Sequence, residues 1–142
     1  MSDLAWADVA ALLDGAGPAH VATVGADGAP HVAILWAGVE EGHLWCMTTA
    51  TAVVADQLAA RPAIAMVWTG NGAETYVWGR AVLERDQATK ERVWYSGLLP
   101  FDPAAFFGSP EDPSVLLVRV VPERATVLRT LVTGPSVQRW HA

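Results

Sequence analysis

Short apolar segments follow one another through tight glycine turns along most of this chain of 142 residues. The stretch AHVATVGADGAPHVAILWA, residues 19–37, holds two such segments around an Asp27-Gly28 turn. Strands joined by a tight turn pair antiparallel, because a parallel pair needs a crossover of about a dozen or more residues. Regular helical crossovers do not separate the segments, so the pattern favours an antiparallel barrel or sandwich over a doubly wound sheet. The expected fold class is mainly β, a β-barrel with flanking short helices.

The same pattern predicts about seven strands and three or four short helices. Strands are expected at residues 19–24, 31–37, 43–49, 63–70 and 74–86, with two more in 114–132 separated at Pro122. Helices are expected from Ser2 or Asp3 to Leu13, from Ala52 to Ala60, and after an Asp86 cap. The segment 31–37 is nearly all apolar and is therefore expected to be buried on both faces, while Gly79 is expected to mark a bulge. Without a linker or a repeat, residues 1–142 are predicted to form a single domain.

Charge and composition exclude several classes of protein. The net charge of −6 argues against nonspecific nucleic-acid binding, which needs a basic surface. Cys46 is the only cysteine, so neither an intramolecular disulfide nor a cysteine-cluster zinc site can form. The N-terminal segment lacks the basic region of a signal peptide, and no apolar run approaches the roughly 18 residues of a spanning helix. We expect a soluble, cytoplasmic protein without a membrane partner.

No set of catalytic side chains can be recognised in the sequence. The four histidines are isolated from one another, which argues against a metal site, and Cys46 lies in an apolar segment that predicts a buried, unreactive thiol. The catalytic residues therefore stay unknown. If the protein is an enzyme, a cofactor is expected to carry the chemistry.

Three threonines stand where a predicted strand ends and a predicted helix begins. Thr48, Thr49 and Thr51 bring hydroxyls to a helix start, whose free N–H groups can bind a phosphate. Thr51 can equally be a simple N-cap, a role that contributes about 1 kcal/mol. The next cation along the chain is Arg61, about 12–15 Å from the first turn of the helix at ~1.5 Å per residue. Both interpretations of the threonines stay open on the residues alone.

The order of several short motifs resembles the FMN-binding split-barrel superfamily, the pyridoxamine 5'-phosphate oxidase-like proteins. The matching segments are DGAPH at 27–31, LWCMTT at 44–49, TAV at 51–53, RPAI at 61–64 and VWGRA at 77–81. The C-terminal third is similar to the branch of general stress protein 26, through Trp94, Phe107, Gly108, Asp112, Pro113, Leu116, Leu117, Val118 and Pro122. The tryptophan that often follows in that branch is absent, and Val127 and Leu128 stand there. The resemblance covers about residues 5–130.

This resemblance implies an antiparallel split β-barrel that forms a homodimer, with an FMN cleft between the protomers. The implied cofactor contacts are Ala33, Ile34 and Leu35 beside the ring, Thr48, Thr49 and Thr51 toward the phosphate, and in addition Met47 and Val53. Four tryptophans are candidates for the dimer interface: Trp36, Trp68, Trp78 and Trp94.

The chain also departs from that family at the phosphate. Members that bind FMN commonly place an arginine and a lysine where Ala33 and Val53 stand here. Two function classes follow from the resemblance. One is an FMN-dependent oxidoreductase acting on a small organic substrate. The other is a noncatalytic member that binds another flat ligand or no cofactor.

Overall fold

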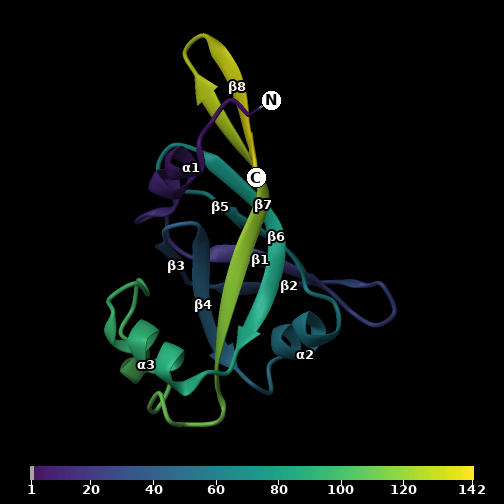
Figure 1. Ribbon diagram of the computed structural model, residues 1–142. Coiled ribbons are helices and arrows are strands. Elements are labelled where there is room, and N and C mark those ends of the chain that lie inside the picture. Colours follow the sequence, from purple (N-terminus) through teal and green to yellow (C-terminus); the bar gives the residue numbers. More distant parts are fainter. Residues whose placement is uncertain (1) are drawn as a thin grey trace.

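The computed structural model describes residues 2–142 and folds most of them into one antiparallel sheet flanked by short helices (Figure 1). The strands are β1 (Ala19–Val24), β2 (Pro30–Leu35), β3 (Ala37–Glu40), β4 (His43–Thr49), β5 (Ala63–Trp68), β6 (Glu74–Glu84), β7 (Val115–Leu131) and β8 (Gly134–His141). The helices are α1 (Trp6–Leu13), α2 (Val53–Ala60) and α3 (Gln87–Tyr95), and a short 3-10 turn covers Pro103–Ala105. The predicted mainly β class with a few short helices is confirmed.

The strands pair in the order β2-β1-β5-β6-β7-β4-β3, and β8 pairs with β7 outside this path. All pairs are antiparallel. Because β2 and β3 end the order without pairing with each other, the barrel stays open along one side. The fold is the antiparallel split β-barrel that the sequence predicts.

Two apolar clusters lie on opposite sides of β4 and β7. Leu44, Cys46, Val118 and Val120 face the interior of the barrel with residues of α1, α2 and β6. Their neighbours face a second cluster beneath α3, which consists of Trp45, Met47, Val93, Trp94, Leu99, Val115 and Leu117. Side chains alternate between the two faces of a strand, so one apolar strand supplies both clusters. Cys46 is fully buried, as predicted, and burial raises the pKa of its thiol to about 12, which disfavours the reactive thiolate.

The C-terminal strands differ from the prediction. The two strands expected on either side of Pro122 are one continuous strand, β7, which pairs with β6 along most of its length. Pro122 fits because the register shifts between Trp78 and Gly79, so its missing N–H falls at an irregularity of the ladder. The predicted bulge at Gly79 is confirmed, and a Cβ there would lie 2.3 Å from the Val121 carbonyl oxygen. Strands β3 and β8 were not predicted as separate strands.

Other predictions fail where burial or capping depends on neighbours. The apolar segment 31–37 is divided at Trp36, and its first part, β2, is an edge strand. Val32 and Ile34 are 63% and 60% exposed, so the prediction that this segment is buried on both faces is wrong. Helix α2 begins after Ala52 without a side-chain cap, so the N-cap role of Thr51 is also wrong. Helix α1 begins later than expected, at Trp6.

Two of the four interface candidates among the tryptophans belong to the core. Trp68 and Trp94 are buried, in the first and second clusters respectively. Their side chains are used in packing within the chain. Trp36 and Trp78 keep exposed surface.

Glu40 connects the β3–β4 hairpin to α3 through a set of charge-assisted hydrogen bonds. Its carboxylate accepts from Arg92 Nη1 at 2.7 Å, Arg92 Nη2 at 3.0 Å and Trp45 Nε1 at 3.0 Å, and it lies 3.2 Å from His43 Nε2. The Arg92 guanidinium first, and then the Trp45 indole, lower the pKa of Glu40 from 4.5 to about 2.

This pairing predicts how stability responds to acid. A carboxyl group whose pKa is lowered by folding stabilises the protein fully above the unfolded value of 4.5, and this contribution is lost as the pH falls toward 2. We expect Glu40→Gln to lower the free energy of unfolding by about 1–3 kcal/mol at pH 7. The difference from wild type should shrink between pH 4.5 and pH 2 in urea titrations. The exposed neighbour Glu41→Gln is the control, and an equal loss in both variants would contradict the prediction.

Candidate functional site

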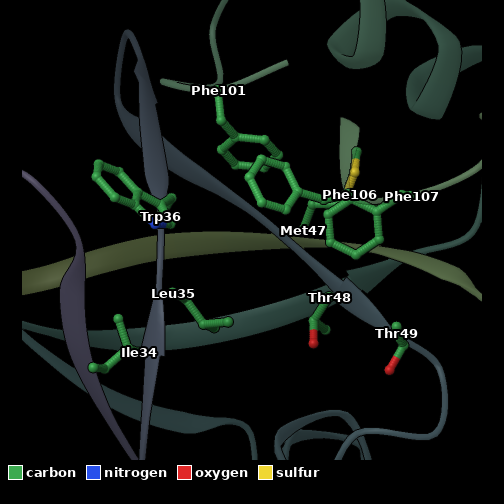
Figure 2. Close-up of a pocket in the computed structure, with 9 residues that line it drawn as sticks. All are labelled: Ile34, Leu35, Trp36, Met47, Thr48, Thr49, Phe101, Phe106 and Phe107. Atoms are coloured by element: carbon green, nitrogen blue, oxygen red, sulfur yellow. The ribbon is translucent and has the colours of Figure 1, made fainter. Parts of the chain in front are cut away.

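A hollow of about 200 Å³ opens where β2 and β4 end beneath the connection from α3 to β7 (Figure 2). Its walls come from three parts of the chain that lie far apart in sequence. The lining residues are Ile34, Leu35, Trp36, Met47, Thr48, Thr49, Phe101, Phe106 and Phe107. We call this hollow the aromatic cavity.

Strand β4 supplies the one hydroxyl-bearing edge of the aromatic cavity. Met47 is buried in the second cluster, Thr48 is nearly buried, and Thr49 is exposed at the end of the strand. In Figure 2 the hydroxyl oxygens of both threonines point away from the phenylalanine rings. The cavity therefore has an apolar end and a hydroxyl end.

Three phenylalanines from the connection between α3 and β7 form the apolar end. Phe101 packs edge-on against Phe106, with ring centroids 5.5 Å apart and planes at 89°, and tilted against Phe107 at 6.3 Å. Phe106 is 72% exposed, although Phe101 and Phe107 are anchored on the second cluster. A large exposed ring beside a hollow is suited to stacking on a flat ligand.

Five of the eight residues predicted to touch a cofactor line the aromatic cavity: Ile34, Leu35, Met47, Thr48 and Thr49. The other three do not line it. Ala33 packs toward the barrel interior, while Thr51 is exposed and Val53 is 54% exposed at the start of α2. Trp36, which follows the predicted ring-side residues on the same segment, also lines the cavity, whereas the three phenylalanines were not predicted. A concentration of phenylalanine in the proline-rich segment PFDPAAFFG, 100–108, was the available signal.

No ionisable side chain is among the nine that line the aromatic cavity. Arg61, the first cation after the threonines, donates from Nε to the Val24 carbonyl oxygen at 3.0 Å, so it is held at the end of β1. Asp56 places a carboxylate in the first turn of α2. Within residues 2–142, no group of three or more histidine, cysteine or acidic residues could hold a metal ion.

An apolar surface continues from the aromatic cavity over the outer side of the sheet. Val32 and Ile34 project outward from β2, and Val32 also lines a second hollow of about 210 Å³ between β2 and β6. There Tyr76 stacks on Trp78 with ring centroids 6.0 Å apart, and the Arg124 guanidinium lies 3.9 Å from the centre of the Trp78 ring. We call this surface the outer β2–β6 face. Exposed apolar side chains that gather on one face in this way are typical of interaction sites.

An open antiparallel barrel with an apolar hollow at the ends of β2 and β4 places the chain in the split-barrel class of folds. The family model described as pyridoxamine 5'-phosphate oxidase matches residues 5–129. The chain belongs to the pyridoxamine 5'-phosphate oxidase family, which confirms the resemblance found in the sequence. No curated protein matches the chain.

Solved structures of low sequence identity share the fold. General stress protein 26 from Bacillus anthracis str. Sterne is 19% identical with a TM-score of 0.71, over 94% of this chain and 97% of that one. A protein from Clostridium acetobutylicum related to general stress protein 26 is 17% identical with a TM-score of 0.76, over 95% and 92%. A pyridoxamine 5'-phosphate oxidase-related, FMN binding protein from Nostoc punctiforme PCC 73102 is 20% identical with a TM-score of 0.67, over 98% and 92%. The predicted likeness to the branch of general stress protein 26 is thereby confirmed.

Among the helices of residues 2–142, none is both long and apolar enough to cross a membrane.

Proposed function

We propose that the aromatic cavity holds the ring system of a flavin and that the protein is a flavin-dependent oxidoreductase acting on a small organic substrate. The observation that carries the proposal is the apolar wall formed by Leu35, Trp36 and three phenylalanines, which ends at the hydroxyls of Thr48 and Thr49. The wall suits an isoalloxazine ring, and the Nostoc punctiforme relative is described as FMN binding.

The residues present fit the two ends of FMN differently. Apolar and aromatic side chains fit the ring of FMN. For its ribityl phosphate tail, the lining residues offer only hydroxyl groups. A bound flavin would supply hydride transfer, and the chain would orient the ring and exclude water from it. No side chain of the cavity is given an acid–base role.

We further propose that a second copy of the chain completes the site. The cavity volume of about 200 Å³ is below the range of roughly 300–1,000 Å³ that is usual for ligand pockets. Ile34 belongs to the cavity and, with Val32, to the outer β2–β6 face, so a protomer packed on this face would extend the cavity wall. The small-molecule substrate would then bind between two protomers.

The proposed dimer can be tested by adding one charge to the outer β2–β6 face. We expect wild type to sediment at twice the 15.1 kDa mass of one chain, and Val32→Glu to sediment as a monomer because burial of an unpaired carboxylate is unfavourable. Val137→Glu changes an exposed valine of β8 and should remain dimeric. A monomeric wild type at micromolar concentration would contradict the proposal.

The flavin proposal can be tested by removing one ring. Because Phe106 is largely exposed, Phe106→Ala should fold normally yet lose stacking worth about 1–3 kcal/mol, so flavin affinity should fall by roughly 5–150-fold. The measurement is a fluorescence titration with FMN and with riboflavin.

Tyr95→Ala is the matched control, since Tyr95 is 73% exposed and lies outside the cavity. Equal affinities of the two variants would show that flavin does not bind at these rings. A wild-type protein that binds no flavin near 1 mM would overturn the proposal.

A second candidate function is noncatalytic binding of a flat ligand. The observation that favours it is the lack of an ionisable side chain among the residues lining the cavity. The two functions differ in reactivity. If the bound flavin can be reduced by a nicotinamide cofactor and reoxidised with turnover, the protein is an oxidoreductase, and if it cannot, the binding function is favoured.

A further inference from the structure

We propose that the aromatic cavity favours flat aromatic ligands without a phosphate, so that riboflavin binds at least as tightly as FMN. This inference rests on the proposed function, because it assumes that a flavin ring enters the cavity. It goes further by naming the charge of the ligand that the cavity selects.

Thr48 and Thr49 carry the only hydroxyls among the lining residues, so a polar ligand tail is best placed there. Hydroxyls match the ribityl chain of riboflavin, whose own hydroxyls both donate and accept hydrogen bonds. A phosphate dianion needs stronger partners, and charge-assisted hydrogen bonds are roughly twice as strong as neutral ones.

Three basic side chains of the chain already have hydrogen-bond partners elsewhere. Arg61 is held by the Val24 carbonyl oxygen, and Arg92 is held in a two-bond pair by Glu40. Lys90, the only lysine, is buried, and its Nζ donates to the Asp112 carbonyl oxygen at 3.3 Å. Each of these side chains already has a partner away from the lining residues. The chain as a whole carries a net charge of −6, which further disfavours a dianion.

Helix α2 begins a few residues after Thr49. The Ala52 N–H already donates to the Thr49 carbonyl oxygen at 3.1 Å. Asp56 lies in the first turn, and its carboxylate offsets the positive end of the helix dipole. The first helical residue is Val53, whose exposed side chain offers no charge. The helix start therefore adds little attraction for a second anion.

The test compares two flavins that differ by the phosphate alone. Riboflavin and FMN are titrated into the full chain at low and high salt, with flavin and tryptophan fluorescence as readouts. We expect riboflavin to bind as tightly as FMN or more tightly, and we expect added salt not to weaken FMN binding, because none of the nine lining residues carries a charge that salt could screen.

One substitution tests where the tail lies. Val53→Lys supplies the missing charge at the start of α2 and should raise FMN affinity about tenfold while leaving riboflavin affinity unchanged. Val53→Met is the uncharged control of similar length and should change neither affinity.

The outcomes separate this inference from the proposed function. FMN binding tenfold tighter than riboflavin, and weakened by salt, would overturn the inference and leave a flavin site in place. A Val53→Lys protein in which FMN gains nothing over riboflavin would also overturn it, because the tail would then lie elsewhere. If neither flavin binds the wild-type protein near 1 mM, both the inference and the proposed function fail.

Discussion

Replacing Gly38 by alanine is expected to lower the free energy of unfolding by about 3 kcal/mol, although it adds a single methyl group. A Cβ at this position would lie 2.0 Å from the Leu98 carbonyl oxygen and 2.6 Å from its carbon. These are backbone atoms, so no side-chain rotation can relieve the clash. Strand β3 and the start of the connection between α3 and β7 would have to separate.

The same change should weaken ligand binding. The displaced segment at Leu98 leads directly into Phe101, Phe106 and Phe107, which form the apolar end of the aromatic cavity. Urea denaturation and flavin titration of Gly38→Ala measure the two effects. Gly42→Ala is the control, because a Cβ at Gly42 meets nothing within 4 Å. Equal stability of the two variants would contradict the close packing of β3 on Leu98.

Trp45→Ala is expected to have the largest effect of all, a loss of about 3–5 kcal/mol in the free energy of unfolding. Trp45 is 2% exposed in the second cluster, and its indole donates to Glu40. Alanine would leave a cavity and remove one of the hydrogen bonds that hold the Glu40 carboxylate. The melting temperature should fall by about 10–15 °C.

Two further variants identify the origin of this loss. Trp45→Phe keeps a ring in the cluster but removes the indole N–H, so it should lose less than alanine does. Trp36→Ala removes an exposed tryptophan and should change stability little. The second cluster also supports Phe101 and Phe107, so Trp45→Ala is expected to disturb the aromatic cavity as well. A Trp45→Ala protein as stable as Trp36→Ala would contradict the assignment of Trp45 to the core.

The sequence predicted best those parts of the fold that depend on local chemistry. The Asp27-Gly28 turn, the bulge at Gly79 and the Asp86 cap, whose carboxylate accepts from the Thr89 N–H at 3.0 Å, follow from residue types that suit special backbone geometry. Strand β8 has no such signal, because its sequence GPSVQRWH is largely polar and begins beside a proline. It forms through pairing with β7, which a local pattern does not reveal.

Which strands are buried and where the cavity lies both depend on which strands become neighbours in the sheet. An apolar strand such as β2 would be buried in the middle of a sheet, but here it lies at the edge, and its outward side chains are exposed. The predicted residues on β2 and β4 meet because the split-barrel topology brings the ends of these strands together. The phenylalanines lie in an irregular segment without periodicity, and the contact of Gly38 with Leu98 helps to place them. Such a long-range contact cannot be predicted from local sequence.

Because β7 is long and lies late in the sequence, it affects how the chain folds during its synthesis on the ribosome. Its first half pairs with β4, its second half with β8, and β6 runs beside most of it. Leu44 of β4 pairs with Val120 of β7, which is synthesised far later. Strand β4 therefore cannot pair with β7 until that later segment has been made. Until then the β3–β4 hairpin of the nascent chain keeps one edge unpaired and apolar. We expect the emerging polypeptide to stay open to chaperones until its last third has left the exit tunnel.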